Sequence, residues 1–218
     1  MVRRFTIAFA VFLSFCFLVA LLSVPGLHLA QSSLEPTSFL VFVSIWVSVV
    51  SLSSLLTSAI ALRRIWFFAG KGESVSLEVL QQQLMAINKM SCPVWVQQKG
   101  RTFLITWRYD QTQWCELISR LGISRIYELR CRFDAKTRTV TLIDRSRPVD
   151  FIVCPDTIKR GRSRPVFPIL GFRMRRLTTV AWYATAEPFE YSFRPKEIKS
   201  PVMGSILNAG WHVRFSLF

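Results

Sequence analysis

The chain has 218 residues, of which 51% are hydrophobic and 19% are charged, and its formal net charge is +15. The charged fraction lies below the ~25% that is usual for soluble domains, which argues against a wholly soluble protein. Four of the 28 basic and one of the 13 acidic residues precede Lys71, so an excess of 12 positive charges belongs to the rest of the chain. Such an excess favours polyanionic partners, either anionic lipid headgroups or nucleic acid.

Two stretches near the N-terminus, Phe5–Val24 and Ser38–Leu62, contain no charged residue. At ~1.5 Å per helical residue, either stretch can cross the ~30 Å hydrocarbon layer of a membrane. The sequence therefore predicts a transmembrane hairpin over residues 1–69. A cleaved signal peptide is the alternative for the first stretch, but the apolar run exceeds the usual ~7–15 residues. A cut before Gln31 also places His28 at the −3 position, where a small residue is expected.

The segment 25–37 between the two stretches is predicted to be a short extracytoplasmic loop. Pro25 and Gly26 predict the end of the first helix, and Pro36 precedes the second. This segment contains no Lys or Arg, whereas basic residues flank both stretches on the other side. These basic residues are Arg3, Arg4, Arg63, Arg64 and Lys71. The positive-inside rule then predicts that both termini are cytoplasmic, most simply in a cell (inner) membrane.

The second apolar stretch is rich in serine, and four of its serines share one helical face. Small residues at such spacing let helix backbones approach closely. We therefore expect a packing seam, against the first span or against another copy of the chain. A polar pore lining is the alternative, although a pore usually carries an ionisable group at depth. The four residues are Ser44, Ser48, Ser51 and Ser58.

Residues 70–218 predict one basic cytoplasmic α+β domain. Apolar residues recur with helical or strand periodicity along it, and turn residues separate the segments. Three short helices are expected, at Ser76–Lys89, at Thr112–Leu121 and from Ser200–Pro201 to Gly210. About eight strands are expected, among them Val94–Gln98, Thr102–Tyr109, Tyr127–Phe133, Thr139–Ile143, Val149–Val153, Thr178–Ala184, Phe189–Arg194 and Trp211–Leu217. The prediction is a mostly antiparallel sheet, curled or forming a partial barrel.

The segment 159–176 has seven basic and no acidic residues, and its glycines and prolines predict a loop. We expect this basic segment to rest on an anionic leaflet or to bind an anionic partner, and a merely solvated basic loop is the alternative. Nucleic acid is the rival partner, but single-strand binders interleave aromatic and basic residues, and the aromatic residues here alternate as core residues do. The basic residues are Lys159, Arg160, Arg162, Arg164, Arg173, Arg175 and Arg176.

Catalytic signals are weak. His212 is the only histidine after His28, and the alternation of its strand predicts that it faces away from the core. Asp144, Asp150 and Asp156 are expected to form surface ion pairs rather than a catalytic pair. Gly70-Lys71-Gly72 is too short for a phosphate-binding loop.

The five cysteines lack the close pairs that zinc sites use, so we expect small buried thiols in a reducing compartment and neither a metal nor a cofactor. They are Cys16, Cys92, Cys115, Cys131 and Cys154. The function predicted from sequence is a non-enzymatic, membrane-tethered binding, scaffolding or regulatory module. A membrane-bound enzyme acting on a lipid, or a small oligomeric pore, are the alternatives.

Overall fold

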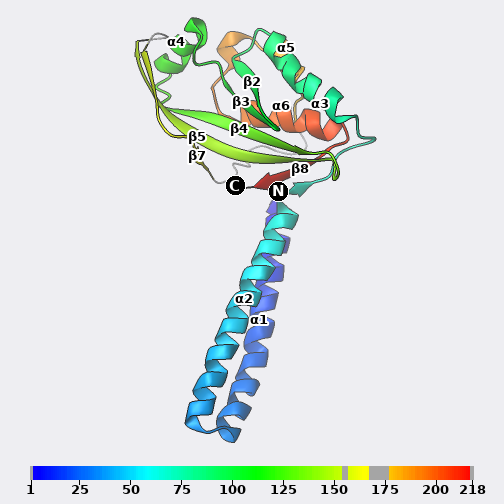
Figure 1. Ribbon diagram of the computed structural model, residues 1–218, viewed down its shortest axis with the longest axis vertical. Helices are drawn as coiled ribbons and strands as arrows, with labels where there is room; N and C mark the ends of the chain where they lie inside the picture. The colour runs from blue at the N-terminus through cyan, green and yellow to red at the C-terminus, as the bar shows by residue number, and fades with distance from the viewer. Residues whose placement is uncertain (1, 154–156, 167–176, 217–218) are drawn as a thin grey trace. The chain divides into compact units, whose positions relative to one another are not determined.

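The computed structural model describes residues 2–153, 157–166 and 177–216. The chain divides into two compact units, Met1–Trp66 and Phe67–Phe218. The first contains two long helices, and the second contains a sheet with several short helices (Figure 1). This arrangement confirms the predicted fold class, an apolar helical hairpin followed by an α+β domain with a mostly antiparallel, open sheet.

The hairpin consists of helices α1 (Val2–Ser33) and α2 (Pro36–Ile65). By length and composition, Phe9–Ser33 and Pro36–Ala61 are long and apolar enough to cross a membrane. A polar contact joins the helices, because the Trp46 indole Nε1–H donates to Ser23 Oγ at 2.9 Å. Within a membrane this bond satisfies an indole that has no water to bind.

The prediction that the first helix ends at Pro25–Gly26 is wrong. Helix α1 continues through Pro25 to Ser33, and only Leu34 and Glu35 separate it from α2. Proline removes one backbone donor and crowds the preceding turn, but apolar helices packed on a neighbour tolerate it. Leu27 and Leu29 extend the apolar sequence beyond the proline, which favours continuation of the helix.

Strand β5 (Thr139–Val153) organises the second unit. Strand β4 (Arg125–Asp134) pairs antiparallel along one edge of β5, and β3 (Thr102–Trp107) and β2 (Val94–Lys99) follow it. Three strands share the other edge: β8 (His212–Ser216) pairs parallel, whereas β7 (Arg164–Pro165) and β6 (Thr157–Arg160) pair antiparallel. The two-residue strand β1 (Phe67–Phe68) pairs with β8. Segments that lie far apart in the sequence therefore pair along the two edges of β5.

Helices cover one face of this sheet (Figure 1). They are α3 (Leu77–Met85), η1 (Ala86–Lys89), α4 (Thr112–Arg120), α5 (Trp182–Thr185), η3 (Pro188–Glu190) and α6 (Pro195–Asn208). Ser76 begins α3 as expected, because its Oγ accepts the Val79 N–H at 3.3 Å. Leu80 and Leu84 of α3 and Ile198 and Val202 of α6 are buried and form the core with the sheet.

Two strand predictions in the C-terminal part are wrong. The expected strand Thr178–Ala184 contains the start of helix α5, and Phe189–Arg194 contains the end of η3 followed by an extended segment. The alternating aromatic residues pack against one another rather than across a sheet: Tyr191 makes edge contacts with Trp114 and Trp182. The alternation of aromatic residues in Phe189–Arg194 therefore reflects packing in an aromatic cluster and not a β-strand.

The start predicted for the last helix is also wrong. Helix α6 begins at Pro195, and Ser200 and Pro201 lie inside it. Proline cannot donate to the carbonyl four residues earlier, which belongs to Glu197. The Tyr183 hydroxyl donates to this Glu197 carbonyl at 2.8 Å instead. The tertiary contact replaces the missing helical bond, which explains why the proline does not end the helix.

Candidate anion-binding surface

The basic segment that the sequence singles out is only partly a loop. Its described part forms β6 and β7, both of which pair with β5. Arg173, Arg175 and Arg176 lie outside the described residues. The side chains of the other four predicted residues, Lys159, Arg160, Arg162 and Arg164, are all exposed.

Residues 161–163, between β6 and β7, are fixed to the sheet by polar contacts. The Ser163 hydroxyl donates to Glu128 Oε2 at 2.5 Å, and Arg145 donates to Ser163 through Nε to Oγ (2.9 Å) and Nη2 to the carbonyl (2.7 Å). Arg147 donates to Glu128 Oε1 at 2.6 Å and to the Gly161 carbonyl at 3.1 Å. These bonds hold the segment between β6 and β7 beside strand β5.

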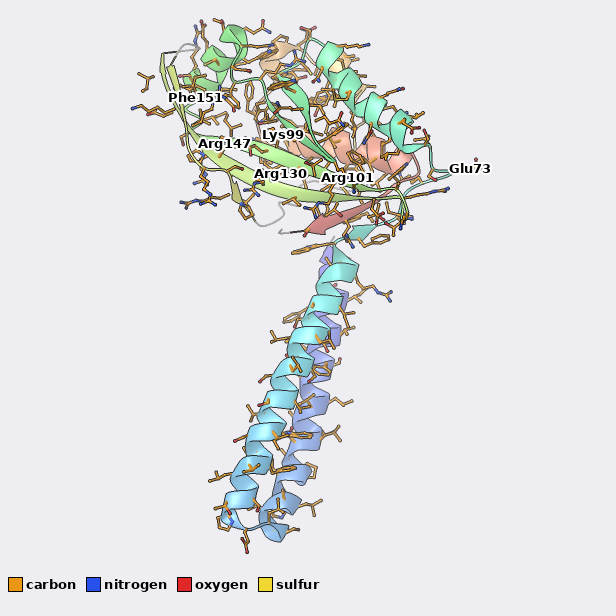
Figure 2. The ribbon with its side chains drawn as sticks, viewed as in Figure 1. Glu73, Lys99, Arg101, Arg130, Arg147 and Phe151 are labelled. Atoms are coloured by element: carbon orange, nitrogen blue, oxygen red, sulfur yellow. The ribbon has the colours of Figure 1, made fainter. Side chains whose placement is uncertain are left out.

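Strands β4, β5 and β8 together carry a set of arginines on one face of the sheet. Direct partners in a ladder point to the same face, and so do alternate residues of one strand. Glu128 pairs with Arg145, and Thr141 pairs with both Arg132 and Arg214, which fixes the common face. We call this set the arginine face; its members are Arg130, Arg132, Arg145, Arg147 and Arg214. Figure 2 shows Arg130 and Arg147 along the two central strands.

The charges of the arginine face are only partly compensated. On the described parts of β4, β5 and β8, the acids of this face are Glu128 and Asp134. Glu128 is buried and already bound by Arg147 and Ser163. Burial lowers the pKa of Arg145, and the positive charge of Arg130 lowers it further, which Glu128 offsets in part. Neighbouring guanidinium groups therefore repel one another here, and an added anion would relieve that repulsion.

Sequence reasoning missed the arginine face because its members are distributed over three strands. Along each strand they read as the ordinary polar half of an alternating pattern. Only the pairing of β4 with β5, and of β5 with β8, brings them together. Arg130 and Arg132 alternate within the predicted strand Tyr127–Phe133, but Arg145 and Arg147 lie beyond the predicted end of its partner at Ile143, so no sequence signal indicated that the four arginines meet.

The opposite face of the sheet contains a buried ionic network that the sequence did not predict. Asp144 was expected at the surface, but its side chain and that of Lys199 are both 0% exposed. The Lys199 ammonium donates to Asp144 Oδ2, and the Tyr127 hydroxyl donates to Oδ1 at 2.8 Å. Lys199 Nζ also lies 4.3 Å from the centre of the Phe215 ring. Burial lowers the pKa of Lys199, whereas the Asp144 charge raises it.

The histidine considered as a catalytic base has a structural contact. His212 is half-buried, and its Nδ1 accepts the Gly70 backbone N–H at 3.0 Å. Its ring also packs against Phe67, with 5.3 Å between ring centres. Asp150 is exposed, as expected, and Asp156 lies outside the described residues. Asp144 and Asp150 therefore have different environments, and Asp144 pairs with Lys199 rather than with a second carboxylate.

The cysteines only partly match the expected buried thiols. Cys92 and Cys131 are buried and free, and Cys16 in α1 is free and exposed. Burial raises the pKa of both Cys92 and Cys131, so both thiols are held in the protonated form. Cys115 is disulfide-bonded, which corrects the expectation of a free thiol. Cys154 lies outside the described residues. Within the described ranges, no group of three or more His, Cys, Asp or Glu residues could hold a metal ion.

The serine stripe of α2 lies largely away from α1. Ser44, Ser48 and Ser51 are exposed in the hairpin, and Ser58 is half-buried. Hydroxyls of the stripe donate to carbonyls one turn earlier: Ser44 to Leu40, Ser48 to Ser44 and Ser58 to Ser54, at 2.8–2.9 Å. The helix itself thus satisfies these hydroxyls. A seam with another copy of the chain stays a prediction.

Comparison of the chain with protein-family models, with curated proteins and with solved structures found no match.

Proposed function

We propose that the protein is a membrane-tethered binding module whose arginine face contacts the anionic headgroups of phospholipids. The apolar hairpin is the anchor, and both termini lie in the cytoplasm at the cell membrane. The observation that carries the proposal is the gathering of five arginines on one sheet face, where the nearest buried carboxylate is already bound.

The orientation is supported by the distribution of basic residues. Arg63 and Arg64 close α2 and Lys71 follows, whereas Leu34 and Glu35 at the opposite end of the hairpin carry no positive charge. Basic residues next to a span favour the cytoplasmic side. The disulfide at Cys115 favours the opposite orientation, because disulfides persist in oxidising compartments.

A reporter fused to Phe218 decides between these two signals. We expect a fluorescent reporter that folds only in the cytoplasm to be active, and a phosphatase reporter that needs the oxidising side to be inactive. The reverse pattern would agree with an oxidised Cys115 and would contradict the proposed orientation. Fusions to Leu34, between the two helices, should give the opposite result.

The energetic basis is electrostatic. A Lys or Arg close to an anionic leaflet contributes about 1 kcal/mol before screening. Arg132 and Arg214 are exposed and Arg130 is half-exposed, so these three members of the arginine face can supply about 3 kcal/mol before screening. Arg145 and Arg147 contribute to the positive field, but their donors are partly used within the protein. Salt should weaken the interaction, since the charges are solvent-accessible.

The test uses the full chain in a neutral detergent, titrated with short-chain phosphatidylglycerol or phosphatidylcholine and followed by thermophoresis. Preferential binding of phosphatidylglycerol, reduced by 0.5 M NaCl at least about tenfold, is the expected result. The double variant Arg130→Gln/Arg132→Gln should lose most of the preference. The matched control Arg120→Gln/Lys136→Gln removes the same charge from α4 and from the β4–β5 turn and should keep it.

Equal affinity for the two lipids would overturn the proposal, and so would equal loss in both double variants. Binding of a short oligonucleotide more tightly than of either lipid would assign the arginine face to nucleic acid instead.

A further inference from the structure

Four members of the arginine face form two pairs, which lie side by side along β4. Arg130 and Arg145 are the first pair, and Arg132 and Arg214 are the second. Arg130 and Arg132 occupy alternate positions of β4. Thr141 of β5 is the ladder partner of both Arg132 and Arg214, and Arg145 follows it by an even number of residues on the same strand. All four side chains therefore point to one face of the sheet, where one ligand can contact them.

The members of the first pair lie close together in spite of their like charges. Arg130 is the diagonal neighbour of Arg145, because Arg145 pairs with Glu128, two residues before Arg130. Diagonal neighbours are about 7–8 Å apart, which is within reach of long side chains. Burial lowers the pKa of Arg145, and the charge of Arg130 lowers it by more than the charge of Glu128 raises it. An anion between the two guanidinium groups would relieve this repulsion.

Both members of the first pair have donors available for such an anion. Ser163 accepts the Nε–H of Arg145 at 2.9 Å and an Nη2–H at 2.7 Å, which fixes the side chain. The Nη1 donors of Arg145 have no partner among the described residues. Arg130 is half-exposed, and within the described ranges it has neither a hydrogen-bond nor an ion-pair partner.

The second pair lies on the two sides of a hydroxyl group. Strands β4 and β8 flank β5, so the Cα atoms of Arg132 and Arg214 are about 10 Å apart. Arg214 Nη2 donates to Thr141 Oγ1 at 3.2 Å, which places its guanidinium over β5, toward Arg132. Both arginines are exposed, and Arg132 has no hydrogen-bond or ion-pair partner in the described part of the chain. A phosphate above Thr141 can therefore contact both guanidinium groups.

One acid of this face lies near the second pair. Asp134 follows Arg132 by two residues on β4. Its carboxylate accepts the Thr137 hydroxyl at 2.8 Å and the Lys136 backbone N–H at 3.1 Å. Asp134 forms no ion pair with a described residue. The carboxylate is thus bound within the β4–β5 turn, and the guanidinium groups of the second pair remain available.

The spacing of the two pairs indicates the ligand. Arg130 and Arg132 are two residues apart on β4, which separates the pairs by about 6.8 Å along the strand. A single phosphate contacts one pair, whereas two phosphates joined by a short bridge contact both. We propose that the arginine face binds a phospholipid headgroup that carries two phosphates, as cardiolipin does with one glycerol between them. This preference rests on the proposed function, because the same arginines provide it.

Two phosphates on one headgroup should bind more tightly than two separate phosphates. Guanidinium groups offer paired N–H donors that match phosphate oxygens. When one phosphate is bound at either pair, the glycerol bridge holds the second phosphate near the other pair, so the second contact is intramolecular. Phosphatidylglycerol, with one phosphate, has no such advantage. The number of phosphates alone would give cardiolipin only about a twofold gain.

The test is native mass spectrometry of the full chain in a neutral detergent, titrated with cardiolipin, phosphatidylglycerol or phosphatidylcholine. The dissociation constant for cardiolipin should lie at least about tenfold below that for phosphatidylglycerol. Phosphatidylcholine, whose headgroup has no net charge, should bind most weakly of the three.

Variants assign the preference to the two pairs. Arg132→Gln/Arg214→Gln removes the second pair and should lower the affinity for cardiolipin about tenfold, while the affinity for phosphatidylglycerol falls by no more than about threefold, because the first pair remains. Arg130→Gln disrupts the first pair and should have the same effect. The control Arg120→Gln/Lys136→Gln removes two charges elsewhere and should keep the preference. Thermal melting of each variant checks that it folds.

A cardiolipin affinity within about twofold of the phosphatidylglycerol affinity would overturn the two-phosphate site. A folded Arg132→Gln/Arg214→Gln that keeps the preference for cardiolipin would also overturn it. In both cases the proposed function stands if phosphatidylglycerol still binds more tightly than phosphatidylcholine and Arg130→Gln/Arg132→Gln removes that difference. If neither anionic lipid binds more tightly than phosphatidylcholine, the two-phosphate site and the proposed function are both contradicted.

Discussion

The two faces of the sheet differ in whether their charged side chains are paired with opposite charges. On the helix-covered face, Lys199 and Asp144 are completely buried and paired with each other, and Tyr127 satisfies the second carboxylate oxygen. On the arginine face, five guanidinium groups share buried Glu128 and exposed Asp134. Charges removed from water need partners, whereas exposed cations do not. The uncompensated charge is therefore found where a ligand can reach it.

The largest effect in this comparison should follow from breaking the buried pair. Lys199→Met leaves the Asp144 carboxylate without its cation, and we expect a loss of about 3–5 kcal/mol in the free energy of unfolding. Urea denaturation of the detergent-solubilised chain measures it.

Adding Asp144→Asn to Lys199→Met should recover part of this loss. The amide removes the unpaired charge, and its oxygen still accepts the Tyr127 hydroxyl. If Lys199→Met lowers the free energy of unfolding by less than about 1 kcal/mol, the Asp144 carboxylate does not depend on the Lys199 ammonium.

An intermediate effect is expected for Ser163→Ala on the arginine face. Glu128 loses the hydroxyl donor at 2.5 Å, and Arg145 loses an acceptor at 2.9 Å. Hydrogen bonds to charged groups contribute about 1.5–3 kcal/mol, and water can partly replace this one, so a loss of about 1–2 kcal/mol is predicted. Ser192→Ala, at an exposed position, serves as the control and should change stability by less than about 0.5 kcal/mol.

The buried pair should also give stability a pH dependence that the arginine face lacks. Because the pKa of Lys199 is lowered in the folded protein from its ordinary 10.5, the unfolded chain binds more protons between the lowered value and 10.5. Stability should therefore rise with pH across that window. Comparing the slope with that of Lys199→Met isolates the contribution, since the variant has no titrating group there. Identical slopes would contradict the lowered pKa.

The smallest effect on stability is expected for the exposed arginines. Arg130→Gln and Arg132→Gln should each change the free energy of unfolding by less than about 0.5 kcal/mol, while anionic lipid binding falls. A large destabilisation would mean that these arginines serve the fold, and the contrast between the two faces would disappear.

Much of the fold follows from local patterns. Apolar length predicts the two helices of the hairpin, and the alternation in Tyr127–Phe133 and Thr139–Ile143 predicts the β4–β5 hairpin that organises the sheet. The errors occur where a distant contact overrides the local signal. Pro201 remains inside a helix because the Tyr183 hydroxyl satisfies the Glu197 carbonyl, and the aromatic alternation near Tyr191 forms a cluster rather than a strand.

The site was harder to predict than the fold. Lys159 and Arg160 were identified from a run of like charges, but their setting depends on pairing with β5. Neither the Arg130–Arg145 proximity nor the Lys199–Asp144 pair has a sequence signal, because each joins residues whose spacing along the chain is arbitrary. Strand register, not composition, determines both.

The most direct test of the central claim is photocrosslinking of the full chain in a bilayer. A benzoylphenylalanine replaces Arg132, which is exposed on the arginine face, or Arg120 on α4 as the control. The protein is reconstituted in phosphatidylcholine with or without phosphatidylglycerol, and lipid adducts are measured by mass spectrometry. The account predicts phosphatidylglycerol adducts at position 132 that exceed those at position 120 and decrease in high salt. Equal adducts at the two positions, or none at position 132, would contradict it.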